Sequence, residues 1–446
     1  MVRLSGPDAY TIATKHLSLH SPLSTLRSPL STLRSPLSTL HSHHATYCCF
    51  DDLDDIVATW YPRGYSGEPT VEFSCHGSRY VQQALVEALV ADGARLAEPG
   101  EFTLRAFLNG RLNLAQAEAV ADLIDAVTPA QHRLAVSQLR GGYAQKLKEL
   151  RQQLVDLTSL LELELDFSQE DVEFADRTQL RQLLSTLHSS LSTLISSFAL
   201  GNALKQGIPV AIVGAPNVGK STLLNALLDD DRAIVSDIPG TTRDTVEGML
   251  TIDGVTFRLI DTAGLRETTD AVEQLGIERS RRACEEALIV LDVIDNPNSP
   301  LSTLHSPLST LHSPLSTLRP HHILVLNKCD LHSLLSTLHS PNTEHRTINV
   351  SAKTGEGLDE LKAALLEAVG DRVDDDTLLS NARHRDALLR VQEALRHADE
   401  GLAGGLAADL VAVDLRDALY HLGTVTGDVT SDQLLANIFS RFCVGK

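Results

Sequence analysis

GAPNVGKS, residues Gly214 to Ser221, is the stretch of sequence that decides the fold of the central part of this 446-residue chain. The apolar run IPVAIV precedes it and TLLNALL follows it, which predicts a strand, a loop and a helix in that order. The spacing G-x-x-x-x-G-K-S is that of a phosphate-binding loop, whose glycines let backbone N–H groups approach phosphate oxygens. Lys220 is expected to reach the β- and γ-phosphates, and the Ser221 hydroxyl to bind Mg²⁺.

Four further motifs follow this loop along the chain. GTTRD (240–244) lies where a Mg²⁺-binding switch threonine belongs, and DTAG (261–264) ends a strand where an acidic residue holds Mg²⁺ through water. NKCD (327–330) ends in Asp330, whose carboxylate can accept hydrogen bonds from both N1 and N2 of guanine, a donor pair that adenine lacks. SAKTG (351–355) would add backbone contacts to the base. The five elements in this order predict a GTP-binding domain of the Ras-like class.

The surroundings of these motifs fit that domain. Residues 207–364 alternate short apolar runs with polar or glycine-rich turns, which is typical of a parallel α/β sheet. The predicted strands are Val210–Val213, Phe257–Ile260, Ala287–Leu291 and Ile323–Leu326.

One catalytic position departs from the Ras-like pattern. The residue after DTAG is Leu265, where Ras-like enzymes carry a glutamine that orients the attacking water. An aliphatic side chain cannot do this, so another residue must. The residues alone leave three candidates on the following segment: Glu267, Asp270 and Glu273.

A seven-residue repeat interrupts the globular pattern. S-P-L-S-T-L-[RH] runs three times from Ser21 to His41 and three times from Ser299 to Arg319, and degenerate copies cover Ser333 to His339 and Leu183 to Leu194. Each unit of the two long tracts carries a proline, which costs a helix interior about 3 kcal/mol. We expect these tracts to be low-complexity insertions. The proline-free copy at 183–194 can lie on a helix.

The remaining sequence predicts two other kinds of structure. Before residue 109, strand-like pieces (Ile56–Trp60, Thr70–Ser74) surround a predicted helix at Tyr80–Ala91. From Asn113 the apolar spacing is helical, and a second long helix is expected from about Ala130 to Leu165. After Gly370 the chain reads as helical to its end. The fold class is therefore an α/β Ras-like GTPase domain inserted in an α-helical domain, preceded by an α+β N-terminal domain.

Composition excludes several classes of protein. The chain has 38 basic and 58 acidic residues, a net charge of −20, which argues against a surface that binds nucleic acid all over. Mean hydropathy is −0.03 and no run of 18 apolar residues occurs, so we expect no membrane-spanning helix. The N-terminus lacks a signal-peptide pattern, and six cysteines in so long a chain do not form a disulfide scaffold, so we expect a cytoplasmic protein.

Beyond single motifs, the chain resembles the tRNA-modifying GTPase family called MnmE or TrmE. The segments that carry the resemblance are YSGEPTVEFSCHG (65–77), PGEFTLRAFLNGRLNLAQAEAVADLIDA (99–126), DTAGLRETTDAVEQLGIERS (261–280) and TSDQLLANIFSRFCVGK (430–446), together with the GTPase motifs. The resemblance implies three domains: a folate-binding and dimerising domain at 1–108, a helical domain at 109–206 and 365–446, and a GTPase domain at 207–364. The repeat tracts at 21–41 and 299–319 are then inserts in the first and third.

The resemblance also implies an activity. Family members form homodimers whose G domains dimerise, and they hydrolyse GTP with stimulation by K⁺. With an FAD-dependent MnmG-type partner, in a heterotetramer, they add a carboxymethylaminomethyl or aminomethyl group to C5 of the wobble uridine of tRNA, using a tetrahydrofolate derivative as the one-carbon donor. The cofactors implied are Mg²⁺, K⁺ and the folate, with GTP as substrate.

The family's functional residues map onto this chain as follows. Glu273 matches the catalytic glutamate, and Cys443 the tail cysteine linked to tRNA modification. Mg²⁺ would be held by Ser221 and Thr242, and K⁺ by Asn217, Ser236, Ile238 and Thr241. Folate contacts fall on Arg3, Glu72, Arg111 and Lys446. The nucleotide would contact Asn217, Val218, Gly219, Lys220, Ser221, Thr222, Ser236, Asp237, Ile238, Pro239, Gly240, Thr241, Thr242, Asp261, Thr262, Ala263, Gly264, Asn327, Lys328, Asp330, Ser351, Ala352 and Lys353.

Two alternatives stay open on sequence alone. One is a GTP-dependent RNA-binding or ribosome-assembly switch, although no basic RNA-binding domain is visible. The other is a degenerate family member with impaired activity, because the repeats replace family sequence and a glycine-rich segment that the family carries ahead of RLSGPDA is missing. On this second alternative we expect impaired folate binding.

Overall fold

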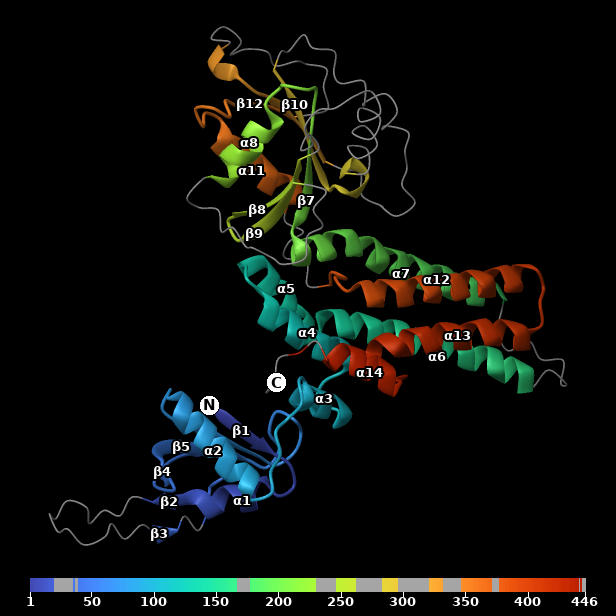
Figure 1. Ribbon diagram of the computed structural model, residues 1–446. Coiled ribbons are helices and arrows are strands. Elements are labelled where there is room, and N and C mark those ends of the chain that lie inside the picture. The colour runs from blue at the N-terminus through green and yellow to red at the C-terminus, as the bar shows by residue number, and fades with distance from the viewer. Residues whose placement is uncertain are drawn as a thin grey trace. The chain divides into compact units, whose positions relative to one another are not determined.

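The computed structural model describes residues 1–19, 35–36, 39–166, 177–229, 246–261, 283–295, 321–331, 346–370, 377–440 and 442. The chain divides into two compact units, whose elements are labelled in Figure 1, and each unit has its own hydrophobic core. Unit 1 comprises residues 1–121 and 426–446, and unit 2 comprises residues 122–425. Both repeat tracts fall almost wholly outside the described residues, as does the copy at 333–339.

Unit 1 is built on a six-stranded antiparallel sheet of order β1-β6-β5-β4-β2-β3. Its strands are β1 (Val2–Ser5), β2 (Leu17–Leu19), β3 (Ser35–Pro36), β4 (Ala45–Phe50), β5 (Asp54–Tyr61) and β6 (Thr70–Ser74). The strand-like pieces predicted at 56–60 and 70–74 are confirmed as β5 and β6. Within the first repeat tract, Ser35 and Pro36 pair with β2 as a short edge strand, where proline's missing N–H costs no ladder bond.

The helices of unit 1 cover this sheet and add a second, smaller core. They are α1 (Ala9–His16), α2 (Arg79–Ala91), α3 (Glu101–Leu108), the start of α4 (Leu114–Asp125) and α14 (Asp432–Phe439). The predicted helix at 80–91 is confirmed as α2, whose buried Leu85 and Leu89 join Phe50 and Phe73. The smaller core lies where α4 meets α14, around Leu114 and Phe439.

Unit 2 begins and ends with long helices. These are α5 (Pro129–Arg140), α6 (Gly142–Asp166), α7 (Arg177–Gln206), α12 (Ala382–Ala403) and α13 (Ala408–Thr426). The single helix predicted from about 130 to 165 is wrong in one respect, because it is broken into α5 and α6. Gly141 adopts φ 95°, a left-handed C-cap that ends α5, and α6 starts at the next residue.

Helix α7 carries the proline-free repeat copy, as expected. Five of its leucines are buried at alternating spacings of four and three residues, which places them on one face: Leu180, Leu184, Leu187, Leu191 and Leu194. The helix packs beside α5, α6 and α12, and Gln392 of α12 donates a hydrogen bond to the Ser192 hydroxyl at 2.8 Å. Leu180–Gln206 is also the stretch, among the described residues, that is long and apolar enough to cross a membrane, with a mean hydropathy of 1.2. Of the most apolar 18-residue window in this stretch, 28% is buried inside the protein.

Between α7 and α12 lies a six-stranded sheet of order β12-β11-β10-β7-β9-β8. Its strands are β7 (Ile208–Val213), β8 (Val246–Ile252), β9 (Val255–Asp261), β10 (Ile289–Ile294), β11 (His321–Leu326) and β12 (Arg346–Asn349). The four predicted strands are confirmed as β7, β9, β10 and β11, and their pairing is parallel. The predicted parallel sheet has one antiparallel edge that was not predicted, because β8 pairs with β9 as a hairpin.

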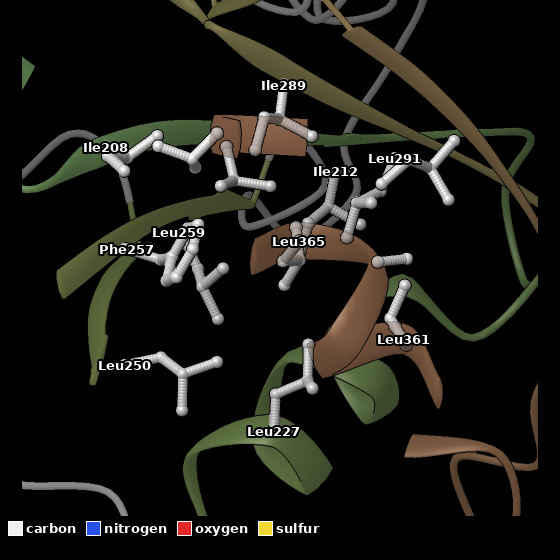
Figure 2. Close-up of a cluster of buried hydrophobic side chains, with 14 of the residues drawn as sticks. Ile208, Ile212, Leu227, Leu250, Phe257, Leu259, Ile289, Leu291, Leu361 and Leu365 are labelled. Carbon is white, nitrogen blue, oxygen red and sulfur yellow. The ribbon is translucent and has the colours of Figure 1, made fainter. Parts of the chain in front are cut away.

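One face of this sheet forms the main core of unit 2. Phe257, Leu259, Ile212 and Leu291 point from the strands toward α8 (Lys220–Leu228) and α11 (Leu358–Val369), as Figure 2 shows. The cluster continues into Ala130 of α5 and Leu204 of α7. The α/β layer and the helical layer of unit 2 therefore share buried apolar surface.

Candidate functional site

The phosphate-loop motif lies between β7 and α8, as the sequence predicts. Neither of its glycines tolerates a side chain. A Cβ on Gly214 would lie 2.2 Å from the carbonyl oxygen of Val293, and a Cβ on Gly219, which has φ 97°, would lie 2.3 Å from Asn327 Nδ2. Glycine is thus required because neighbouring strands and loops approach the backbone this closely.

Lys220 is the first residue of α8 and is 7% exposed. Its ammonium group donates hydrogen bonds to the carbonyl oxygens of Gly214 at 2.8 Å and Ala215 at 2.9 Å, so the side chain lies over its own loop. Ser221 and Thr222 follow on the exposed side of the helix start. Backbone N–H groups at a helix N-terminus, a lysine and a hydroxyl are together the groups that bind phosphate and its counter-cation.

Asn327 joins the phosphate loop to the two base-recognition motifs. It is 2% exposed, and its side-chain amide donates to the carbonyl oxygen of Val218 at 2.8 Å. Its side-chain oxygen accepts from the backbone N–H of Ala352 at 3.1 Å. One buried side chain therefore links its own loop to the phosphate loop at Val218, 109 residues earlier, and to the SAKTG loop at Ala352, 25 residues later.

Asp330 is oriented by the SAKTG segment. The buried Ser351 hydroxyl donates to Asp330 Oδ1 at 2.8 Å and accepts from the backbone N–H of Thr354 at 3.3 Å. The turn that follows needs glycine, because a Cβ on Gly357 would lie 2.0 Å from the carbonyl oxygen of Asn349. The carboxylate predicted to read the guanine edge is thus held by a second motif.

Lys328 makes contacts that the sequence did not suggest. Its ammonium donates to the carbonyl oxygen of Asn217 at 2.9 Å and pairs with Asp295 Oδ2 at 2.9 Å. Asp295 directly follows β10 and belongs to no motif. The sequence offered one signal for Asp295: an acidic residue at the C-terminal end of β10, the strand that pairs with β11. In α/β sheets, ligands bind at that end of the strands.

Several predicted site residues lie outside the described residues. Of the Mg²⁺ and K⁺ ligands, the structure describes Ser221 and Asn217. Asp261 is described by its backbone only, as the last residue of β9. In the part of the chain that is described, no cluster of three or more His, Cys, Asp or Glu side chains could hold a metal. The residues outside are Ser236, Asp237, Ile238, Pro239, Gly240, Thr241, Thr242, Thr262, Ala263, Gly264, Glu273, Cys443 and Lys446.

In unit 1, two of the predicted folate contacts meet. Arg3 of β1 lies opposite Glu72 of β6, and its guanidinium contacts Glu72 Oε1 at 2.8 Å from Nε and 2.7 Å from Nη2. The same guanidinium lies 5.6 Å from the ring centroids of Tyr65 and Phe102. Arg111 is exposed beside the turn at Gly67, where an added Cβ would lie 3.1 Å from Arg111 Cγ.

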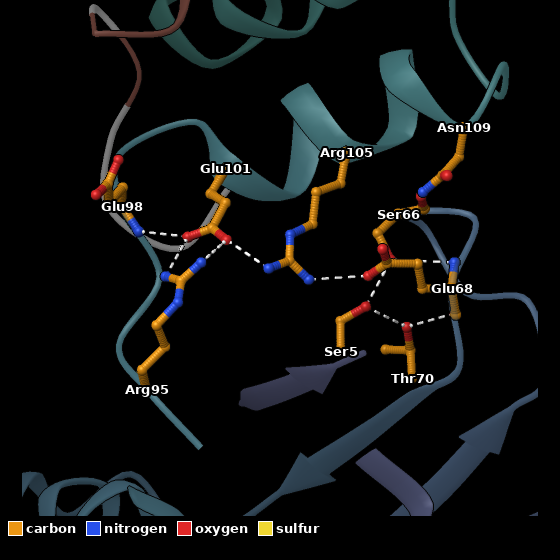
Figure 3. Close-up of polar contacts among 9 residues, drawn as sticks. All are labelled: Ser5, Ser66, Glu68, Thr70, Arg95, Glu98, Glu101, Arg105 and Asn109. Carbon is orange, nitrogen blue, oxygen red and sulfur yellow. Dashed lines mark hydrogen bonds and ion pairs between the residues drawn. The ribbon is translucent and has the colours of Figure 1, made fainter. Parts of the chain in front are cut away.

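A row of charged side chains, Arg95, Glu101, Arg105 and Glu68, links α3 to the segment before β6 (Figure 3). Glu101 binds Arg95 and Arg105, and Arg105 Nη1 reaches Glu68 at 2.9 Å. Hydrogen bonds from Arg95, the backbone N–H of Glu98 and the charge of Arg105 outweigh burial and lower the pKa of Glu101 to about 2. The carboxylate is therefore charged throughout the physiological range.

The polar contacts continue into the turn at 66–70. Ser5 Oγ lies 2.5 Å from Ser66 Oγ and 3.0 Å from Thr70 Oγ1, and Asn109 donates to the carbonyl oxygen of Ser66 at 2.8 Å (Figure 3). The end of β1, this turn and the C-cap of α3 are thus held together by polar side chains, of which Ser66 and Thr70 are buried and Asn109 is exposed.

Comparison with known proteins identifies the family. The model of the TrmE N-terminus, described as a GTP-binding protein, matches residues 1–111, and the MnmE helical-domain model matches residues 114–443. The tRNA modification GTPase MnmE of Flavobacterium johnsoniae is 46% identical over 402 residues, covering 88% of this chain and 86% of the relative. That of Parabacteroides distasonis is 44% identical over 458 residues, covering 100% and 96%.

Among solved structures, the G domain of the T. maritima FeoB iron transporter aligns with 36% of this chain and 98% of its own, at 28% identity and a TM-score of 0.25. The assignment rests on the sequence matches, which span both units and include every described element of the nucleotide site. The chain belongs to the MnmE family of tRNA modification GTPases.

Proposed function

We propose that this chain hydrolyses GTP to GDP and phosphate as part of tRNA wobble-uridine modification. The observation that carries the proposal is the set of contacts through Asn327, which joins the phosphate loop, the NKCD segment and the SAKTG segment at one edge of the sheet. Relatives named tRNA modification GTPase cover nearly all of the chain. The site and the family point to the same activity.

The described residues divide the work between the two ends of the nucleotide. Asp330, held by Ser351, would accept the N1 and N2 hydrogen bonds of guanine. Lys220 would exchange its two loop carbonyls for the β- and γ-phosphate oxygens. Because both groups are fixed by protein contacts, little ordering remains to be done when GTP binds.

Two cations fit the donor chemistry that the loop offers. The exposed Ser221 hydroxyl is an oxygen ligand of the kind that Mg²⁺ prefers, with Thr242 as its proposed second protein ligand. The Asn217 carboxamide is exposed on the loop and would bind K⁺ together with Ser236, Ile238 and Thr241. When bound, these ions neutralise charge that develops on the transferred phosphoryl group. Glu273 would orient the attacking water in place of Leu265.

The wider reaction is proposed from the family. The protein would act as a homodimer in the cytoplasm, with an FAD-dependent MnmG-type partner and tRNA as substrate. Residues 1–108 would bind the folate through Arg3, Glu72, Arg111 and Lys446, and Cys443 would take part in the modification. Residues 109–206 and 365–446 would form the helical domain that carries the G domain of 207–364. Arg3 and Glu72, two of these four residues, lie within 2.7 Å of each other, so a single ligand could contact both.

Steady-state hydrolysis of GTP and ATP by the purified chain, in K⁺ and in Na⁺, tests the proposal. We expect hydrolysis of GTP but not ATP, faster in K⁺ than in Na⁺. Glu273→Ala should abolish hydrolysis but keep GDP binding, whereas Glu360→Gln, on the exposed side of α11, should change neither. Equal rates in the two salts would contradict the cation assignment. GTP binding without hydrolysis in either salt would identify an impaired member of the family.

Asp330→Asn tests the guanine assignment separately. An asparagine offers one donor and one acceptor, which matches the 2-oxo edge of xanthine and mismatches guanine. We expect the variant to prefer XDP to GDP in a fluorescence competition assay. An unchanged preference for GDP would show that Asp330 does not contact the base.

A further inference from the structure

Two strained residues meet at the nucleotide site. Asn217 and Lys328 have φ values of 66° and 63°, and only five non-glycine residues in the described part of the chain have positive φ. Such conformations are disfavoured for residues with a side chain and persist only where surrounding contacts impose them. The hydrogen bond from the Lys328 ammonium to the Asn217 carbonyl oxygen, 2.9 Å long, joins these two residues directly across 111 positions of sequence.

Asp295 is the second partner of the Lys328 ammonium. Its Oδ2 lies 2.9 Å from Nζ, and the two side chains are 37% and 35% exposed. Asp295 follows the last residue of β10, and the adjoining Ile294 carbonyl accepts the backbone N–H of Asn327 at 2.7 Å. The backbone hydrogen bonds between β10 and the segment after β11 therefore place the Asp295 carboxylate next to Lys328.

We propose that Asp295 is a positioning residue for the nucleotide site. By pairing with the ammonium of Lys328, it directs that group at the Asn217 carbonyl and so couples the base-recognition segment to the conformation of the phosphate loop. Asp295 itself need not touch the nucleotide. The inference rests on the proposed GTPase function, because Lys328 and Asn217 are taken as nucleotide-binding residues.

The expected effect is modest and depends on charge. A lysine ammonium sits on a flexible stem, and a neighbouring carboxylate restricts the positions that it takes. This ion pair is about one-third exposed, so salt partly screens it. We therefore expect Asp295→Asn to weaken GDP binding about fivefold, which corresponds to about 1 kcal/mol. The loss should appear mainly as faster GDP dissociation, because the phosphate loop is then held less firmly.

A double-mutant cycle on the full chain tests this coupling. Fluorescent GDP is used to measure the dissociation constant and rate for the wild type, Asp295→Asn, Lys328→Met and the double variant. If Asp295 acts through Lys328, its substitution should have almost no effect once Lys328 is methionine. Asp295→Glu keeps the charge within reach of the flexible lysine and should restore most of the affinity.

Two controls separate positioning from general damage. Asp292→Asn removes a carboxylate from the same strand, but Asp292 pairs with His322 at 3.0 Å, so GDP binding should be unchanged. The thermal unfolding midpoint without nucleotide should be the same for Asp295→Asn and the wild type. Wild-type affinity in Asp295→Asn, or an undiminished loss in the Lys328→Met background, would overturn the inference while leaving the GTPase function intact. Failure of the wild type to bind GDP would overturn both.

Discussion

Single buried side chains hold the nucleotide site together, and Asn327 is the clearest example. Its side-chain amide donates a hydrogen bond to the Val218 carbonyl and accepts one from the Ala352 N–H. Asn327→Ala removes both hydrogen bonds at a buried position. We expect a loss of about 2 kcal/mol in unfolding free energy and GDP binding at least tenfold weaker. Chemical denaturation and calorimetric titration measure the two quantities.

Asn349→Ala is the matched control for that substitution. Asn349 is an exposed asparagine of β12, and no hydrogen bond of its side chain to the site motifs is recorded among the described residues. Its replacement should leave GDP affinity within twofold of the wild type. A comparable loss in the two variants would mean that Asn327 acts through general stability and not through its hydrogen bonds.

At this scale, the motifs could be predicted from sequence but their contacts could not. Lys220, Asn327, Asp330 and Ser351 were identified because spacing and residue type report their chemistry. Asp295 was missed because its role depends on where β10 ends relative to β11, which only tertiary structure determines. The switch residues predicted from the family, Glu273 among them, stay predictions.

Among the elements, α3 depends on an ionised carboxylate. The folded-state pKa of Glu101 is about 2, below its ordinary value of 4.5, so the stabilisation it provides is complete above pH 4.5 and is lost as the pH falls toward 2. Because Arg95 is largely exposed and screened by solvent, we expect about 2 kcal/mol from this source at pH 7. Glu101→Gln should therefore be less stable than the wild type at pH 7, and the difference should shrink below pH 4.5.

Urea unfolding of unit 1 from pH 3 to pH 7 measures this dependence. Glu98→Gln is the control, since Glu98 is exposed in the same loop and contributes its backbone N–H to Glu101. That variant should follow the wild-type curve. A stability difference for Glu101→Gln that does not change with pH would point to lost packing and not to the charge.

Helix α7, which contains the degenerate repeat, is stabilised by the leucines buried on one of its faces. Leu187 is 2% exposed and Leu183 is 46% exposed, although both belong to the same repeat copy. Leu187→Ala should reduce the unfolding free energy by about 3 kcal/mol, since it removes buried methyl groups and leaves a cavity. Leu183→Ala, one turn earlier, should change stability by less than about 0.5 kcal/mol. Equal losses would contradict the buried-face assignment of α7.

The elements show where sequence patterns succeed and fail. Strands β7, β9, β10 and β11 were predicted because strands buried on both faces read as continuous apolar runs. The break between α5 and α6 was missed because the apolar spacing continues across it, and only the two adjacent glycines at 141–142 mark it. Strand β8 was missed because its edge position, with mixed polar and apolar residues, leaves a weak pattern.

For the whole molecule, the two units have separate apolar cores. Unit 1 is organised around Phe50 and Phe73, and unit 2 around Phe257 and its neighbours, which also bind α5 and α7 to the G-domain sheet. In unit 2 the turn of the β8–β9 hairpin contacts α5 directly: the Ala130 N–H donates to the Gly254 carbonyl at 3.2 Å. We therefore expect the G-domain sheet and its flanking helices to unfold together, and unit 1 to unfold in a transition of its own.

Ligand binding and mutation should move these two transitions independently. We expect GDP with Mg²⁺ to bind only the native form of unit 2, and at about 100 times its dissociation constant it should then stabilise that unit by about 2.7 kcal/mol. Glu101→Gln should lower only the other transition, because the partners of Glu101 within the described ranges, Arg95, Arg105 and the backbone N–H of Glu98, lie in unit 1. Differential scanning calorimetry of the full chain, with and without GDP·Mg²⁺, measures both shifts. A single transition that responds to the nucleotide and to the substitution alike would show that the two units unfold as one cooperative body.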